Sequence, residues 1–122
     1  MSFPILIKKK GNYFVEDVAI DSIIEKFTTP TYIYSKQRIV DNFKNLEYAF
    51  KNVDHLICYA VKANSNLAIL NLLAKNGAGF DIVSGGELKR VIAANGDPKK
   101  IVFSGVGKTS EEIKLAIENN IL

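Results

Sequence analysis

Apolar runs and amphipathic segments alternate along the chain from about residue 31 onward. Three short runs are largely apolar, as is typical of strands covered on both faces of a parallel sheet, and they span residues 56–61, 80–83 and 101–103. Between and after these runs, apolar residues recur at steps of three and four, which predicts helices beginning near residues 67, 85 and 110. Strands and helices in this alternating order indicate an α/β fold.

A further helix is predicted after Ser35, which we interpret as its N-cap and which follows a β-prone run at 31–34. One face of this helix is apolar and consists of Ile39, Phe43, Leu46 and Phe50. Two other helix starts have the form of a capping box, in which the first and fourth side chains bond to each other's backbone N–H groups. These are Ser84-x-x-Glu87 and Thr109-x-x-Glu112, and residues 121–122 resemble the start of a further strand.

The first twenty residues follow a different pattern. Residues 5–7 and 13–15 predict two short strands around a turn at Gly11-Asn12, with no helix between them. We therefore expect a separate β segment over residues 1–20. Ser22-x-x-Glu25 then predicts the start of a short helix, whose inward side chains are Ile23, Ile24 and Phe27.

The predicted strands end at Val61, Val83 and Phe103, so one strand-and-helix unit takes about 20 residues. Units of this length suit either a doubly wound sheet or a (βα)8 barrel. A complete barrel needs about 250 residues, so the three units within residues 21–122 cannot close one.

Composition excludes several classes of protein. The 122 residues predict about one domain, and a hydrophobic share of 48% with 24% charged residues is that of a globular chain. The net charge is +3 without a clustered basic face, so no nucleic-acid partner is expected. No apolar run reaches the roughly 18 residues of a membrane span, so no membrane partner is expected either.

The cysteine and histidine content limits the kinds of bond and metal site that the chain can form. Cys58 and His55 are single residues of their kinds, which allows neither an internal disulfide nor a zinc site, so no metal is expected. The apolar N-terminal residues precede Lys8-Lys9-Lys10, the reverse of a signal peptide, and a reducing cytoplasmic location is favoured. Residues 102–109 end like a phosphate-binding P-loop, but Val102 stands where its first glycine is required.

Lys62 is the first candidate for chemistry. It follows a predicted buried strand directly, at the carboxyl end where parallel sheets and barrels bind their ligands. Partial desolvation there would raise the fraction of free amine, which can form a Schiff base with an aldehyde cofactor or a carbonyl substrate. The structural alternative is a lysine that merely ends a strand and reaches solvent.

Two carboxylates accompany Lys62. Asp81 lies inside an apolar run, where an ionised carboxylate needs a partner, and it would meet Lys62 if their strands are neighbours. A structural ion pair or a strand-end cap explains Asp81 equally well. Capping of the helix after Ser84 already accounts for Glu87.

The segment Tyr59-Ala60-Val61-Lys62-Ala63-Asn64 is similar to the cofactor-lysine motif of the fold-type III pyridoxal-phosphate enzymes. This family includes the decarboxylases of ornithine, arginine and diaminopimelate and the alanine racemases. The resemblance is strongest to the diaminopimelate branch, and it is carried by residues 29–34 (TPTYIY), 79–88 (GFDIVSGGEL) and 101–109 (IVFSGVGKT). The spacing of these segments also agrees, and the resemblance covers nearly the whole chain.

The resemblance implies that residues 21–122 are the N-terminal part of a pyridoxal-phosphate-binding (βα)8 TIM-type barrel, of about three βα units, preceded by the β segment 1–20. Lys62 would hold pyridoxal 5'-phosphate covalently, Asp81 would lie beside the cofactor, and Glu87 would lie near the site. The implied enzyme is a carbon–carbon lyase of lysine biosynthesis, which decarboxylates meso-2,6-diaminopimelate to L-lysine and releases carbon dioxide. Its partners are an amino-acid substrate and, as a homodimer, a second subunit.

Members of this family are longer than 122 residues and carry further site residues in later βα units and a C-terminal β domain. The resemblance therefore implies that the chain is an N-terminal fragment, which is expected to be inactive alone. Two alternatives stay open. One is a decarboxylase of another basic amino acid or polyamine precursor, such as ornithine, arginine or carboxynorspermidine, and the other is a non-catalytic fragment.

Overall fold

A computed structural model describes residues 5–121 of the chain. The chain divides into two compact units, with the division between Asp41 and Asn42. This division lies later than the boundary after residue 20 that the sequence pattern favours, because a helix and the start of the next one belong to the first unit. No helix of the described residues is long and apolar enough to cross a membrane.

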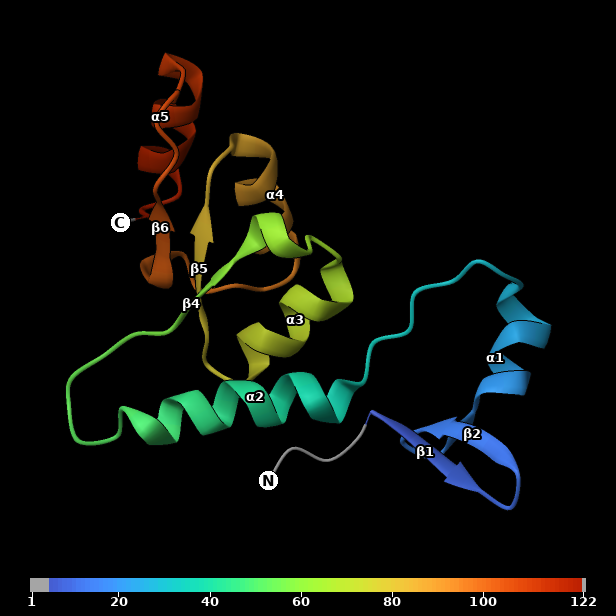
Figure 1. Cartoon of the computed structure of the whole chain (residues 1–122). Coiled ribbons are helices and arrows are strands. Elements are labelled where there is room, and N and C mark those ends of the chain that lie inside the picture. The colour runs from blue at the N-terminus through green and yellow to red at the C-terminus, as the bar shows by residue number, and fades with distance from the viewer. Residues whose placement is uncertain (1–4, 122) are drawn as a thin grey trace. The chain divides into compact units, whose positions relative to one another are not determined.

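The first unit contains a small antiparallel sheet (Figure 1). Strand β1 (Leu6–Lys9) pairs with β2 (Asn12–Val15), which pairs with β3 (Val18–Ala19). The turn between β1 and β2 uses positive φ values at Lys10 and Gly11, of 49° and 90°. The predicted hairpin is thus confirmed, whereas β3 has too few residues to show an alternating pattern.

Helix α1 (Ile20–Phe27) begins three residues earlier than predicted. Ala19 occupies the N-cap position, and Ser22 lies inside the helix, where its hydroxyl donates to the Ala19 carbonyl at 2.8 Å. The predicted capping role of Ser22 is therefore wrong. Ile24 and Phe27 are exposed, contrary to the inward positions expected for them, because the small sheet covers only part of the helix.

Helix α2 (Lys36–Ala49) follows a segment at 31–34 that is not a strand, contrary to its β-prone composition. These four residues have no neighbouring strand with which to form a ladder. Ser35 is the N-cap as predicted, since its Oγ accepts a hydrogen bond from the Arg38 N–H at 3.0 Å. On the predicted apolar face Phe43 is buried, whereas Leu46 and Phe50 are exposed.

The second unit is built on a parallel sheet of three strands in the order β4-β5-β6. Along the chain its elements are β4 (Cys58–Ala60), the 3-10 turn η1 (Val61–Ala63), α3 (Leu67–Lys75), β5 (Gly79–Ile82), α4 (Gly85–Ala93), η2 (Pro98–Lys100), β6 (Ile101–Phe103) and α5 (Ser110–Glu118). The predicted order of strands and helices is confirmed. Strand β4 is shorter than the apolar run because η1 turns the chain away at Val61.

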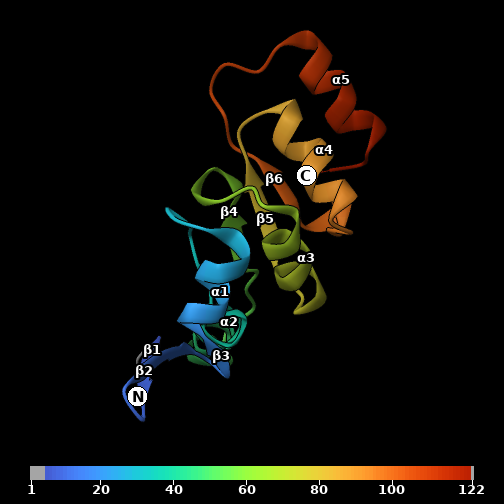
Figure 2. The same ribbon diagram turned by 90° about the vertical axis from the view of Figure 1, so that its right-hand side faces the viewer.

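One face of this sheet forms the core of the second unit. The fully buried side chains of Phe80, Ile82 and Ile101 lie on this face, and the largest buried helix side chains are Leu70, Leu88 and Val91. Helices α3 and α4, which carry these three, lie on the same side of the sheet (Figures 1 and 2). Because side chains alternate along a strand, the residues between the core positions point to the opposite face.

Polar side chains cap the N-termini of the helices in the second unit. Asn66 caps α3, Ser84 caps α4 and Thr109 caps α5, each by accepting a hydrogen bond from a backbone N–H in the first turn. Thr109 and Glu112 form the complete capping box that was predicted. No strand forms at Ile121, and Leu122 lies outside the described residues.

Candidate functional site

The face of the parallel sheet opposite the core carries the candidate chemistry. The strand register places Ala60, Asp81 and Val102 beside one another across β4, β5 and β6. Asp81 is half-buried on this face, and Val102 is exposed. We refer to these residues and the chain that follows each strand as the open face. Carboxyl ends of parallel strands meet at one edge, which is where such sheets place functional groups.

Lys62 lies in η1, two residues beyond Ala60 and so just past the carboxyl end of β4. The preceding residue, Val61, is fully buried and anchors the turn in the core. The Lys62 side chain itself is exposed, so the partial desolvation expected from its sequence neighbours is wrong. The chain leaves the sheet at Val61, so Lys62 lies in η1 and not in the covered strand.

Hydrogen bonds hold the loop that carries Lys62. The Tyr59 hydroxyl donates to the Asn64 carbonyl at 3.3 Å and so spans the turn from its base. The Arg90 guanidinium, from α4, donates to the Ser65 carbonyl at 3.3 Å. The backbone around Lys62 is thus fixed by groups from β4 and α4, while the amine remains accessible.

Asp81 occupies the middle of the open face. Its Oδ1 accepts a hydrogen bond of 2.5 Å from the hydroxyl of Ser104, which comes directly after β6. Asp81 and Lys62 do not form an ion pair within this part of the chain, although their strands are neighbours as expected. The carboxylate therefore satisfies its need for a partner through a hydroxyl.

Cys58 lies two residues before Ala60, on the same face as Asp81. Burial, and secondly the negative charge of Asp81, raise the pKa of the Cys58 thiol above its usual value. The thiol is half-buried and stays protonated near neutral pH.

Glu87 is engaged at the start of α4. Its Oε2 accepts a hydrogen bond from the Val83 N–H at 2.8 Å, and its own N–H donates to Ser84 Oγ at 3.2 Å. The predicted capping box is thus half formed, because the glutamate bonds to the residue before the N-cap. Glu87 therefore connects the end of β5 to the helix that follows.

Sequence reasoning missed Ser104. The signal was present, since Ser104 is the first polar residue after the apolar run at 101–103 and continues the alternation that places Val102 on the open face. No group of three or more His, Cys, Asp or Glu able to hold a metal ion occurs between residues 5 and 121.

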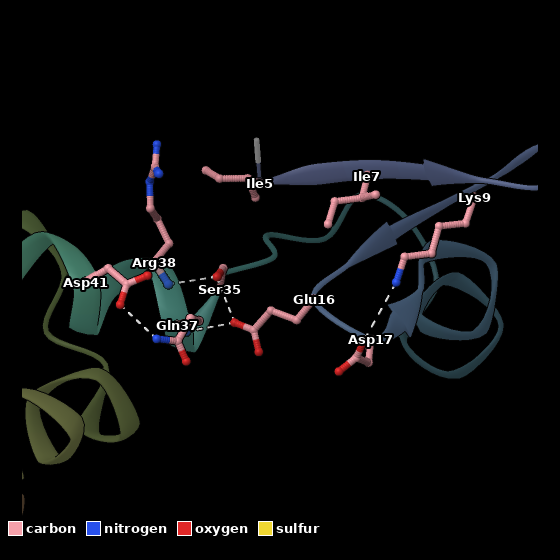
Figure 3. Close-up of a pocket in the computed structure, with 9 residues that line it drawn as sticks. All are labelled: Ile5, Ile7, Lys9, Glu16, Asp17, Ser35, Gln37, Arg38 and Asp41. Carbon is pink, nitrogen blue, oxygen red and sulfur yellow. Dashed lines mark hydrogen bonds and ion pairs between the residues drawn. The ribbon is translucent and has the colours of Figure 1, made fainter. Parts of the chain in front are cut away.

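A separate cavity of about 340 Å³ lies in the first unit. Figure 3 shows Glu16 beside it, accepting hydrogen bonds from Ser35 Oγ at 2.7 Å and from the Gln37 N–H at 2.8 Å. The hydrogen bond from Gln37, followed by that from Ser35, lowers the pKa of Glu16 below its usual value. Lys9 and Asp17 form an ion pair at 3.7 Å in the same lining. Glu16, Lys9 and Asp17 are thus each engaged by another residue of this lining.

The fold and the open face define an α/β domain of parallel βα units with a lysine and a carboxylate at the carboxyl edge of its sheet. The chain belongs to the pyridoxal-dependent decarboxylases, because residues 36–122 match the sequence model of their pyridoxal binding domain. The family predicted from the sequence is thereby confirmed.

Two curated relatives with high similarity to the chain are both diaminopimelate decarboxylases. The chain is 56% identical over 108 residues to the diaminopimelate decarboxylase of Pseudomonas fluorescens, covering 88% of this chain and 26% of that protein. Similarity to the diaminopimelate decarboxylase of Aquifex aeolicus extends over 98% of this chain and 28% of that protein, at 44% identity. The chain thus spans little more than a quarter of the length of these relatives.

Solved structures agree with this similarity. The diaminopimelate decarboxylase of M. jannaschii superposes with a TM-score of 0.91 at 43% identity, over 96% of this chain and 28% of that one. A second structure of the M. jannaschii protein, in complex with L-lysine, gives a TM-score of 0.90. The lysine decarboxylase of Selenomonas ruminantium, at 24% identity and a TM-score of 0.77, covers 90% of this chain and shares the fold.

Proposed function

We propose that this chain is the N-terminal part of an enzyme that decarboxylates meso-2,6-diaminopimelate to L-lysine and carbon dioxide, with pyridoxal phosphate held by Lys62. The position of Lys62 just past the carboxyl end of β4, on a hydrogen-bonded loop, carries this proposal. The substrate is supported by the 56% identity to a diaminopimelate decarboxylase. A relative crystallised with L-lysine supports the product.

The residues of the open face fit an aldehyde cofactor. Lys62 offers an exposed primary amine on a fixed backbone, which is what an aldehyde needs in order to reach the nitrogen. Asp81 supplies a negative charge on the same face, suited to a cationic nitrogen. Pyridoxal phosphate, when bound, supplies an electron-withdrawing ring that stabilises the charge left as a carboxylate departs from the substrate.

Each side chain then has a distinct part. The Lys62 amine would hold the cofactor through its aldehyde carbon, before the substrate binds and again after the product leaves. Asp81 stabilises positive charge beside this amine and orients the group that carries it. Glu87 accepts the Val83 N–H and so fixes the end of β5 relative to α4, which stabilises the backbone near the site.

The assembly follows from the same proposal. Residues 21–122 would be the first part of a (βα)8 barrel, in which the open face becomes part of the barrel interior, and residues 1–20 would form a preceding β segment. The remaining cofactor and substrate contacts would come from the rest of a longer chain and from a second subunit of a cytoplasmic homodimer. The chain by itself would then hold the cofactor without completing the reaction.

Covalent labelling tests the assignment of Lys62. The purified chain is mixed with pyridoxal phosphate, reduced with borohydride and mapped by mass spectrometry. We expect close to one label per chain, on the peptide that contains Lys62, because this amine lies on the fixed and accessible loop. Lys62→Ala should remove that label.

Lys44→Ala is the matched control, since Lys44 is an exposed lysine of α2 and belongs to none of the strands and loops that form the open face. This variant should label like the unsubstituted chain. Label spread evenly over the surface lysines, or retained in Lys62→Ala, would refute the assignment of the cofactor to Lys62.

A further inference from the structure

Ser104 comes directly after β6 and points its hydroxyl at the carboxylate of Asp81. We propose that Ser104 is a positioning residue of the Lys62 site, which fixes the orientation of the Asp81 carboxylate on the open face. This inference rests on the proposed function and adds a residue to it.

The hydrogen bond connects two neighbouring strands. Asp81 is the register partner of Val102, and Ser104 lies two residues further along the same strand direction, on the same face. The Ser104 hydroxyl donates to Asp81 Oδ1 at 2.5 Å. The bond joins residues that are 23 positions apart in sequence.

The backbone fixes the serine independently of its side chain. The Ser104 N–H donates to the Ile82 carbonyl at 3.0 Å, which continues the pairing of β5 with β6 past the last strand residue. The next residue, Gly105, lies so close to β5 that a Cβ atom there would be 2.8 Å from the Val83 carbonyl oxygen. The placement of the hydroxyl therefore depends on one side-chain torsion, χ1, which a serine orders at little entropic cost.

Occupation of Oδ1 determines what the carboxylate can offer to the site. An ionised carboxylate has two oxygens and several lone pairs, and it can rotate about its terminal torsion. A donor bonded to Oδ1 restricts that rotation, so Oδ2 keeps a defined direction. Such supporting hydrogen bonds commonly decide how well a charged side chain meets its ligand.

A solution measurement tests the hydrogen bond without any cofactor. The chain is labelled with 13C-aspartate and moved from H2O to D2O, which deuterates the Ser104 hydroxyl. The 13Cγ resonance of Asp81 should then shift by more than the 13Cγ resonance of the exposed Asp54. The excess shift should persist in Ser104→Thr, which keeps a hydroxyl, and disappear in Ser104→Ala. An unsubstituted chain without the excess shift would overturn the inference.

A labelling measurement tests the positioning role. With limiting pyridoxal phosphate and borohydride, Ser104→Ala should slow the labelling of Lys62 about three- to tenfold, which corresponds to the net contribution of one ordinary hydrogen bond. Ser104→Thr should label within about twofold of the unsubstituted chain. Ser110→Ala, which changes an exposed serine of α5, is the matched control and should have no effect.

The outcomes separate the two proposals. Equal Lys62 labelling in Ser104→Ala and in the unsubstituted chain would overturn the positioning role and leave the proposed function intact. Slower labelling of Lys62 that comes with label spread over the other lysines and an earlier urea transition would show a merely structural serine and also overturn it. If Lys62 is not labelled preferentially even in the unsubstituted chain, the proposed function fails and takes the positioning role with it.

Discussion

At the scale of single residues, Asp81 acts on two neighbours on the open face. Its carboxylate accepts the Ser104 hydroxyl, and its charge acts together with burial to raise the pKa of the Cys58 thiol. Cys58 therefore adds no negative charge to the open face near neutral pH. The neighbouring glycine at 105 makes the arrangement possible, because its backbone lies against β5.

Gly105→Ala should destabilise the second unit by about 1–3 kcal/mol, because the added Cβ meets the Val83 backbone and the strand must shift to admit it. Urea unfolding followed by circular dichroism measures the change. Gly107→Ala is the control, since no heavy atom lies within 4 Å of a Cβ at that position. Equal stability of the two variants would show that β6 and β5 do not approach closely at Gly105.

At the scale of elements, two glutamates bind the N-termini of helices that lie more than twenty residues away in sequence. Glu16 comes after β2 and accepts the Gln37 N–H at the start of α2, at 2.8 Å. Glu112, in the first turn of α5, accepts the Gly85 N–H at the start of α4, also at 2.8 Å. A carboxylate is favoured there by the unpaired N–H groups and by the helix dipole. These bonds join elements that short-range capping leaves unconnected.

The stability of Glu112→Gln should fall less steeply with decreasing pH than the stability of the unsubstituted chain. The hydrogen bond from the Gly85 N–H, followed by that from Thr109, lowers the pKa of Glu112 below its ordinary value of 4.5. The unfolded chain then takes up the proton first as the pH falls. The stabilising contribution is thus complete above about pH 4.5 and is lost as the pH falls through the lowered pKa.

Thermal unfolding at a series of pH values measures this effect. Glu111→Gln is the control, since it removes the same charge from the same helix turn outside the bond to Gly85. If both variants keep the slope of the unsubstituted chain between pH 3 and pH 5, carboxylate bonding at Gly85 does not contribute.

At the scale of the whole molecule, the second unit has one apolar core on the helix-covered face of its sheet. Its members come from every strand-and-helix pair, so the parallel sheet and the covering helices are stabilised together. The open face carries Asp81, Val102 and the chain after each strand, and it contributes little to this core. Functional residues can therefore occupy that face without weakening the fold.

Phe80→Ala should cost about 3–5 kcal/mol, because the fully buried ring at the centre of β5 leaves a cavity. We expect an earlier urea transition and a loss of the selective labelling of Lys62, whose loop depends on the same unit. Phe27→Ala removes an exposed ring of α1 and should cost less than about 1 kcal/mol. Similar costs for both variants would contradict a core centred on β5.

The local pattern of the sequence was sufficient to predict the strands and helices of the second unit. Helix α3 and strand β6 begin and end where periodicity predicts, and Thr109 with Glu112 forms the predicted box. Short-range bonding and side-chain periodicity determine these features, and both are visible in a few consecutive residues. The same reasoning singled out Lys62 and Asp81 from their places along predicted strands, and their roles toward a cofactor stay predictions.

Tertiary structure alone decided the features that depend on distant residues. Residues 31–34 lack a pairing strand, Lys62 is exposed in η1, and Asp81 bonds to Ser104 rather than to the lysine. A strand needs a partner, and a carboxylate takes whichever donor the register brings within reach. The sequence by itself therefore determined the order of the βα units and the residues with chemical potential, while strand register and the course of one turn decided which of them meet.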